Sequence, residues 1–394
     1  MSDHGHALAR DFSFSATSDL RAFLTARDLE RDHGGDVFGW ARKLGVEAGE
    51  ILDFSASVNP LGPPLSARRA FFKSFHELSC YPDSDAGEAR EAIARQCRLE
   101  PRQVLLGSGS TQLIHLLCRA LRPRKALVVH PAFSEYANGL KLVGAEIRSY
   151  LLSAQDDFTF SLERFTKALQ ENPDMIFLAN PNSATGRAIP RAKIEEVARM
   201  AREKKTFLVV DEAFIDFVEA DSVQDLIRDN PYLIVLNSPG KYYALPGLRL
   251  GYLLAARRVV DRLCLHREPW SVNTPAQRVL SACFNDANFK RKTRRWLERE
   301  REFLLGGLSR IRWLRPYESQ ANFLLVRLAR GSASRLHALL LKRKMLIRVC
   351  DSFSGLGADY FRVAIRSREE NRRLLEALEG ILGGGSHSSG VLSL

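Results

Sequence analysis

Three features are missing from this sequence of 394 residues, and each absence excludes a class of protein. There is no uninterrupted apolar run of the roughly 20 residues that a membrane-spanning helix requires. The first 32 residues are too polar for a secretory signal peptide. The six cysteines are scattered and form no Cys-x-x-Cys pair. We therefore expect a cytoplasmic enzyme with reduced thiols, no membrane partner and no metal site.

The formal net charge of +12 does not by itself identify a partner. Such a charge fits nucleic acid, an acidic surface or an anionic small molecule. The densest basic run, residues 290–295, is followed by Trp296 and the acidic Glu298 and Glu300, as on one solvated helix face. No nucleic-acid motif accompanies that run. We expect no nucleic-acid partner.

From Val104 onward, short apolar runs alternate with amphipathic helices. This alternation predicts an α/β fold with a mainly parallel sheet covered by helices. Strands are expected at residues 104–106, 126–129, 175–178, 207–210, 233–236 and 248–253. Beyond about residue 265, a charged helical run at 290–305 and a strand at 321–328 predict a second, smaller α+β domain.

These patterns divide the chain into five predicted segments. Residues 1–32, with helical fragments such as Asp19 to Arg31, are expected to form an appended arm. The small domain is expected to combine residues 33–80 with residues 266–382, and the large domain to span residues 81–265. Residues 383–394 are rich in glycine and serine and are expected to form a flexible tail.

Two polar segments directly follow predicted strands. The segment Gly107 to Thr111 opens a helix, where free N–H groups and hydroxyls can bind an anion. Asp211 and Glu212 follow the strand at 207–210, where α/β folds place ligands. Ordinary loops and helix caps explain either segment equally well when it is taken alone.

A third segment contains Lys241. This lysine follows a predicted strand end, with Ser238 shortly before it and Arg249 shortly after it. A lysine, a hydroxyl and an arginine so placed have the parts of a Schiff base and a phosphate clamp. A surface lysine is the simpler explanation of Lys241 alone, so the functional hypothesis depends on all three segments together.

Residues 33–380 resemble fold-type I pyridoxal 5′-phosphate (PLP) enzymes of the class I/II aminotransferase superfamily. Within it they resemble the branch that holds the histidinol-phosphate aminotransferases and the threonine-phosphate decarboxylases of cobalamin biosynthesis, and the decarboxylases more closely. The resembling segments are His33 to Gly35, Leu52 to Ala56, Asn59 to Gly62, Asp211 to Phe217, Tyr243 to Tyr252, Pro269 to Asn273, Leu346 to Cys350 and Tyr360 to Ser367. The resemblance implies the aspartate-aminotransferase fold, with a mainly parallel seven-stranded sheet in a large PLP-binding domain.

The resemblance also implies roles for single residues. Lys241 forms the Schiff base with PLP and later moves protons, and Asp211 pairs with the protonated pyridine nitrogen, whose pKa it raises. Phe133 stacks on the ring. The implied cofactor-binding set is Gly109, Ser110, Thr111, Phe133, Asn182, Ser183, Asp211, Ser238, Lys241, Arg249 and, from a neighbouring subunit, Tyr81. A contribution from a neighbouring subunit implies a homodimer.

For the substrate, the resemblance implies that Arg362 binds an α-carboxylate through two parallel hydrogen bonds. A second anionic group is expected to bind near His33, Asn59, Arg348 and Arg366. Residues 360–365 are expected to form a strand, in which the even spacing of Arg362 and Arg366 puts both side chains on one face, so Arg366 is expected to face the same pocket as Arg362. The alternative is that Arg348 and Arg366 form ordinary surface ion pairs with neighbours such as Glu369.

The chain departs from the family pattern at several positions. Ser183 stands where an asparagine usually reaches the ring hydroxyl of PLP, and Phe214 cannot supply the phenol that aminotransferases often aim at the same oxygen. That oxygen is expected to be weakly held unless Asn182 turns inward. Ser57 and Gly240 also differ from the family pattern.

Two enzymatic functions and one non-enzymatic function fit these residues. We favour PLP-dependent decarboxylation of an O-phosphorylated small amino acid, because the segments outside the cofactor set resemble the decarboxylases. The alternative is an aminotransferase of the histidinol-phosphate type acting on an anionic amino substrate. A non-catalytic PLP-binding protein is a third hypothesis, which the presence of both Lys241 and Asp211 disfavours.

Overall fold

The computed structural model describes residues 33–218, 222–284 and 286–383. The arm expected at residues 1–32 and the tail expected beyond Gly383 lie outside the described residues. In the described ranges, the search for a helix with the length and apolar character of a membrane span finds none.

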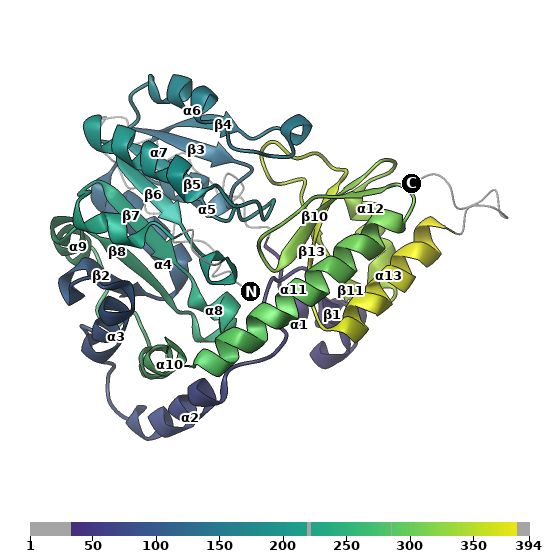
Figure 1. Ribbon diagram of the computed structural model, residues 1–394. Helices are drawn as coiled ribbons and strands as arrows, with labels where there is room; N and C mark the ends of the chain where they lie inside the picture. The colour runs from purple at the N-terminus through teal and green to yellow at the C-terminus, as the bar shows by residue number, and fades with distance from the viewer. Residues whose placement is uncertain (1–32, 219–221, 285, 384–394) are drawn as a thin grey trace, which may run out of the picture.

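The larger sheet has seven strands in the order β2-β8-β7-β6-β5-β3-β4 (Figure 1). They are β2 (Val104–Gly107), β3 (Lys125–His130), β4 (Glu146–Leu151), β5 (Met175–Ala179), β6 (Phe207–Asp211), β7 (Leu233–Asn237) and β8 (Gly251–Ala255). β8 runs antiparallel to its neighbours β2 and β7, and all other pairs are parallel. The mainly parallel seven-stranded sheet is confirmed.

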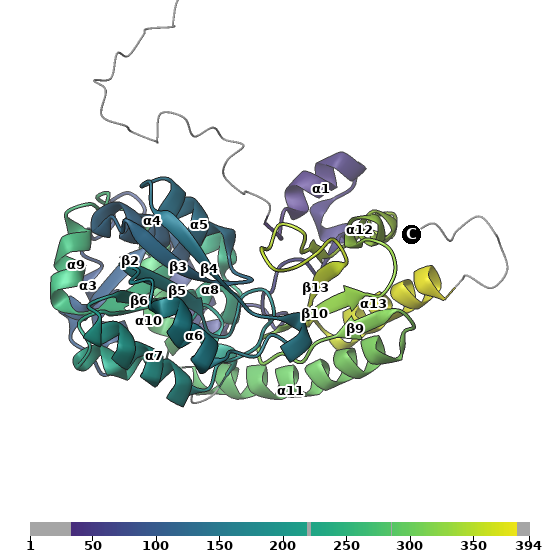
Figure 2. The ribbon, with the colours of Figure 1, turned by 90° about the horizontal axis from the view of Figure 1, so that it is seen from above.

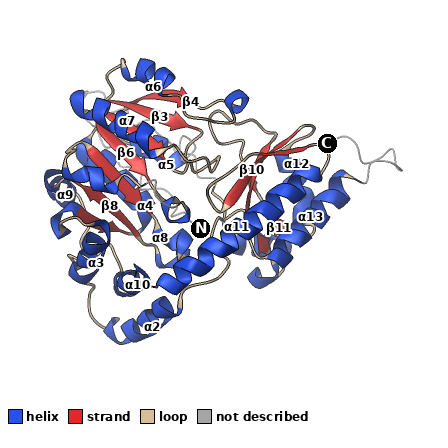
Figure 3. Ribbon diagram, in the orientation of Figure 1, coloured by secondary structure: helices blue, strands red, loops and turns tan. Residues whose placement is uncertain are grey.

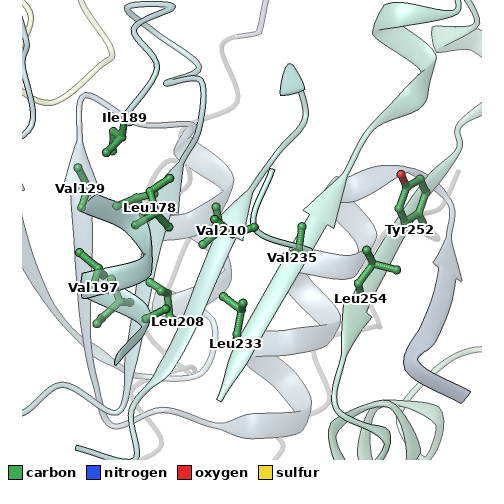
Figure 4. Close-up of a cluster of buried hydrophobic side chains, with 14 of the residues drawn as sticks. Val129, Leu178, Ile189, Val197, Leu208, Val210, Leu233, Val235, Tyr252 and Leu254 are labelled. Carbon is green, nitrogen blue, oxygen red and sulfur yellow. The ribbon is translucent and has the colours of Figure 1, made fainter. Parts of the chain in front are cut away.

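Helices cover both faces of this sheet, which explains why its central strands are apolar up to their last residues. Val210 and Val235 belong to the apolar cluster under one set of helices, whereas the alternate residues Val209 and Ile234 belong to the opposite cluster. Figure 4 shows the first cluster, with Val197 facing the strands. The first set is α3 (Gly87–Cys97), α6 (Leu162–Leu169), α7 (Arg191–Glu203) and α10 (Thr274–Phe284); the second is α4 (Gly109–Leu121), α5 (Ser134–Lys141) and α9 (Arg257–Cys264).

A smaller antiparallel sheet has the order β12-β13-β10-β9. Beside it, β1 and β11 form a parallel pair. The strands are β1 (Leu52–Asp53), β9 (Leu314–Pro316), β10 (Phe323–Leu328), β11 (Met345–Leu346), β12 (Arg348–Val349) and β13 (Tyr360–Ala364), and the neighbouring helices are α1 (Val37–Leu44), α12 (Ala333–Leu341) and α13 (Arg368–Leu382). An α/β fold with additional α+β structure is therefore present (Figure 3).

The long helix α11 (Ala287–Arg310) joins the two sheets. It begins beside the larger sheet and ends against the smaller one (Figure 2). Trp296, Leu304 and Leu308 pack with Leu324 of the smaller sheet in one apolar cluster. Fully burying a side chain such as leucine contributes about 1.5–3 kcal/mol, so this cluster holds α11 firmly against the smaller sheet.

One strand of the larger sheet was not expected, and the bounds of two others differ in ways that affect the site. β4 was not anticipated, because it is an edge strand whose side chains are mostly exposed rather than an apolar run. β8 begins at Gly251 rather than at Leu248, because residues 246–248 form a short 3-10 turn and Arg249 has a left-handed backbone. β13 ends at Ala364, before the position of Arg366.

Candidate active site

Most of the side chains expected from the sequence meet at one cavity of about 290 Å³. Two larger cavities lie elsewhere and are lined by none of the expected residues. The expected residues at the 290 Å³ cavity are His33, Gly109, Ser110, Thr111, Phe133, Ser183, Asp211, Ser238, Lys241, Arg249, Arg348 and Arg362. They come from the strand ends of the larger sheet, from β12 and β13 of the smaller one and, for His33, from the segment before α1.

Lys241 lies on the short helix α8 (Pro239–Tyr242), directly after β7. Its Nζ lies 4.8 Å from the ring centroid of Phe214. Burial, against the opposing charge of Asp211 and together with the nearby charges of Arg362 and Arg249, lowers the pKa of Lys241 to about 8. A lysine with a lowered pKa carries more of the neutral, nucleophilic amine near neutral pH.

Asp211 is the last residue of β6 and is almost completely buried. Its Oδ2 accepts a hydrogen bond of 2.6 Å from the Tyr136 hydroxyl, and its Oδ1 accepts one of 2.9 Å from the Ala213 N–H. Burial raises the pKa of Asp211, although the charge of Lys241 and these hydrogen bonds oppose the rise. A cationic ligand atom beside Asp211 would stabilise the carboxylate further.

Tyr136 was not anticipated from the sequence. It is fully buried on α5, and its ring stacks on Phe177 at 4.9 Å with an interplanar angle of 12°. Burial raises the pKa of Tyr136 well above its ordinary value, so the hydroxyl stays a donor to Asp211. The sequence shows only a tyrosine on the apolar face of a helix, which gives no sign of a polar partner.

The first turn of α4 and Arg249 form a cradle of hydrogen-bond donors. Gly109 has a φ of +82°, and a Cβ at this position would lie 2.7 Å from Arg249 Nη2. A Cβ on Gly251 would lie 2.5 Å from the Ser110 nitrogen. The two glycines therefore let Arg249 and the start of the helix approach closely. Free N–H groups at a helix start beside a guanidinium suit a phosphate.

At the other end of the cavity, Arg348 on β12 lies opposite Arg362 on β13. The Arg362 Nη1–H donates to the Ser183 carbonyl oxygen, while its buried Nε has no hydrogen-bond partner in the part of the chain described. Burial, together with the charge of Arg348, lowers the pKa of Arg362 to about 10. An anion between the two guanidiniums would relieve this burial and repulsion.

Two buried hydroxyls at the cavity also lack partners among the residues described. They are Ser57 Oγ and Ser183 Oγ. A buried polar group without a hydrogen bond costs about 1–3 kcal/mol. Unsatisfied hydroxyls, the cradle at Gly109 and the neighbouring Asp211 and Lys241 all fit a polar, phosphorylated ligand such as PLP.

Two asparagines expected at the site do not line the cavity. Asn182 is buried and donates to the Pro131 carbonyl oxygen, while its Oδ1 accepts from the N–H groups of Ala184 and Thr185. Its amide therefore holds a turn and does not turn inward. The side-chain Nδ2 of Asn59 donates to the Tyr242 carbonyl oxygen, and its backbone N–H donates to the Lys241 carbonyl oxygen at 3.0 Å. Asn59 therefore stabilises α8 and does not line the cavity.

Arg366 and Tyr81 also lie away from the cavity. Arg366 pairs with Glu370 at 2.7 Å and donates to the Asp53 carbonyl oxygen, because β13 ends before it and α13 begins nearby. The ion pair considered as the alternative is present, with Glu370 in place of Glu369. Tyr81 is exposed and stacks on Trp270 with ring centroids 4.6 Å apart.

A seven-stranded, mainly parallel sheet with a lysine and an aspartate at its strand ends defines the class of fold-type I PLP enzymes. The chain belongs to the class I and II aminotransferase family, whose family model matches residues 49–378. This family is PLP-dependent, so the cofactor expected from the sequence is confirmed.

Relatives of both expected activities are similar to this chain. Threonine-phosphate decarboxylase from Salmonella typhimurium is 36% identical over 354 residues, which cover 89% of this chain and 97% of that protein. The structure of histidinol-phosphate aminotransferase from Clostridium acetobutylicum matches with a TM-score of 0.80 at 28% identity, covering 85% of this chain and 100% of that one. That of L-threonine-O-3-phosphate decarboxylase from Porphyromonas gingivalis matches with a TM-score of 0.77 at 26% identity, covering 84% and 100%.

Proposed function

We propose that this protein is a PLP-dependent decarboxylase of an O-phosphorylated small amino acid, similar in activity to threonine-phosphate decarboxylase. The observation that carries the proposal is the pair Arg348 and Arg362 at the cavity that holds Lys241. A phosphorylated amino acid has two anionic groups, a carboxylate and a phosphate, and each suits one arginine. Histidinol phosphate has a phosphate but no carboxylate, so it would leave one of the two arginines without an anionic partner.

In this proposal, residues 81–265 supply the cofactor end of the site. Ser110, Thr111, Ser238 and Arg249 bind the PLP phosphate, Phe133 stacks on the ring and Asp211 keeps the pyridine nitrogen protonated. When bound, PLP supplies an electron sink for the pair of electrons released when a bond to the substrate Cα breaks.

Lys241 and Arg362 divide the remaining work. Arg362 holds the substrate carboxylate, and the aromatic rings of Phe214 and Phe323 beside these two residues limit access of water. After carbon dioxide has left, a protonated Nζ of Lys241 would donate a proton to the substrate Cα, where it replaces the lost carboxylate. A lysine whose pKa is lowered to about 8 suits a proton donor and acceptor near neutral pH.

We further propose that the protein is a cytoplasmic homodimer. The segment 61–81 exposes several large apolar side chains, of which Leu61, Leu65, Phe72, Phe75 and Leu78 are examples. A concentrated apolar surface of this kind favours contact with another protein surface. Tyr81 ends the segment, is exposed and does not line the cavity of its own chain, so we propose that it contacts the site of the neighbouring subunit.

One assay separates the proposed activity from its alternatives. Purified protein with PLP is incubated with O-phosphothreonine, with and without 2-oxoglutarate, and carbon dioxide and keto-acid products are followed. We expect carbon dioxide at a rate that does not depend on 2-oxoglutarate. Keto-acid formation that requires 2-oxoglutarate indicates an aminotransferase, and the absence of both products contradicts a catalytic role toward this substrate.

A further inference from the structure

Glu135 lies directly behind the wall of the cavity, near the start of α5. Its side chain is only 10% exposed. One carboxylate oxygen, Oε1, lies 3.2 Å from His33 Nε2 and accepts from Asn138 Nδ2 at 2.9 Å. The other, Oε2, lies 2.6 Å from His115 Nε2. Both oxygens are therefore engaged, and the two strongest possible donors are imidazoles from distant parts of the chain.

Glu135 carries a negative charge in this position. Burial alone would raise the pKa of its carboxyl, but the hydrogen bonds from His115, His33 and Asn138 outweigh burial and hold the pKa well below its ordinary value. The first turn of α5 also favours an anion, because of the helix dipole. A buried carboxylate is normally matched by a cation, and the nearest candidates here are the two imidazoles.

The two histidines differ in where they lie. His33 lines the cavity together with Lys241 and Arg348, and its ring centroid lies 5.3 Å from that of Phe133. His115 does not line the cavity and contacts Glu135 from α4. Because Glu135 occupies Nε2 of His33, the nitrogen that remains for a ligand is Nδ1.

An imidazole that donates a hydrogen bond from each nitrogen is protonated. A carboxylate at one nitrogen orients the ring and stabilises the protonated form, as carboxylates behind metal-binding histidines do. With Glu135 at Nε2 and a phosphate at Nδ1, His33, which lines the cavity, would donate from both nitrogens. Together with Arg348, it would bind the more highly charged of the two anionic groups of the substrate.

We propose that Glu135 is a positioning residue for substrate recognition, which orients His33 and supplies the countercharge that lets His33 donate from Nδ1 to the substrate phosphate. This inference rests on the proposed function, because it requires a phosphate on the substrate. Glu135 itself contacts neither the substrate nor the reacting atoms.

A double-mutant cycle with Glu135→Gln and His33→Ala tests this coupling. We expect Glu135→Gln to raise KM for the phosphorylated amino acid by about tenfold and to leave kcat nearly unchanged, because a charged hydrogen bond is weakened. In the His33→Ala background, the same substitution should change KM little. His115→Gln is the matched control: it removes the other imidazole on Glu135 and should leave KM unchanged. An equal effect of Glu135→Gln with and without His33 overturns the proposal.

A second measurement does not depend on turnover. Inorganic phosphate is titrated into the PLP-loaded enzyme, and the ring nitrogens of ¹⁵N-labelled histidine are followed by NMR, with His33→Ala identifying the signals. We expect phosphate to shift the His33 signals in the unmodified enzyme and to require about tenfold more phosphate in Glu135→Gln. If phosphate does not shift the His33 signals of the unmodified enzyme, the proposal is overturned. This outcome does not depend on whether Glu135→Gln folds.

The two measurements also separate this inference from the proposed function. A wild-type enzyme that releases no carbon dioxide from the phosphorylated amino acid contradicts the proposed function. In that case the response of His33 to phosphate still decides whether Glu135 prepares an anion site.

Discussion

The two ends of the cavity are formed by different structural elements. The end with Asp211 and Lys241 lies at adjacent strand ends of one sheet, β6 and β7, whose residues are buried except for the partly buried Phe207. The end with Arg348 and Arg362 comes from the edge of the smaller sheet, and His33 adds to it from the beginning of the described chain. One end is fixed within a single sheet, whereas the other depends on how two sheets and a distant segment meet.

This difference suggests that the first end carries the chemistry and the second selects the substrate. Changes at the first end should therefore reduce turnover of every substrate. Changes at the second end should discriminate between substrates that differ in one anionic group.

The largest effect is expected for Lys241→Ala. Turnover should fall at least about 1,000-fold for any substrate, because proton transfer by a positioned side chain contributes about 10²–10⁴-fold and the nucleophile is lost as well. Steady-state kinetics of the PLP-loaded protein measures this change. Lys292→Ala, at an exposed lysine of α11, is the control and should behave as wild type. Near-normal turnover by Lys241→Ala would remove Lys241 from the chemistry.

Asp211→Asn should reduce turnover by about tenfold to a hundredfold, because a charged hydrogen bond of about 1.5–3 kcal/mol to the cofactor nitrogen is lost. The protein should stay folded. Burial raises the pKa of Asp211, so its charge is costly in the folded state and a neutral amide of the same shape is tolerated. Turnover and thermal unfolding are measured on the same sample. A folded variant with wild-type turnover would contradict this role.

Arg348→Ala sharpens the comparison at the other end. The catalytic efficiency, kcat/KM, should fall about tenfold to a hundredfold for a phosphorylated amino acid and change little for its unphosphorylated parent. Arg366→Ala is the matched control, because the Arg366 guanidinium pairs with Glu370 away from the cavity. Equal losses for both substrates in Arg348→Ala, or a selective loss in Arg366→Ala, would show that the anion site lies elsewhere.

The smallest effect concerns pH. Because the pKa of Lys241 is lowered to about 8, its amine is protonated and unreactive below that pH. The rate at which cofactor-free protein captures PLP should rise about tenfold per pH unit below this value and level off above it. Asp211→Asn removes a charge that raises this pKa, so its plateau should begin at lower pH. Stopped-flow absorbance follows the capture, and a plateau only near the ordinary value of 10.5 would contradict the lowered pKa.

The two ends of the cavity also differ in how well the sequence predicts them. Asp211 and Lys241 were located correctly relative to their strands, because apolar runs that end in polar residues are local signals. Arg366 was expected at the cavity, but strand β13 ends at Ala364 and Glu370 pairs with the guanidinium. No local pattern reveals where a strand ends when apolar residues continue beyond it.

The positions of other side chains depend on contacts across the fold. Asn182 was expected near the cofactor, yet its amide oxygen accepts from Ala184 and Thr185 and holds the turn. Tyr136 and Glu135 were not anticipated, because their partners lie far away in the sequence and are reached only through packing of α5 against the sheet and α4. Sequence patterns predict secondary structure and motifs better than they predict such partners.

The most direct test of the whole account is chemical trapping of the cofactor. The PLP-loaded protein is reduced with borohydride, digested and analysed by peptide mass spectrometry. We predict that the pyridoxyl group is found on Lys241, and that Lys241→Ala releases all cofactor on unfolding. A pyridoxyl group on another lysine, or none on Lys241 in a protein that decarboxylates its substrate, would contradict the account.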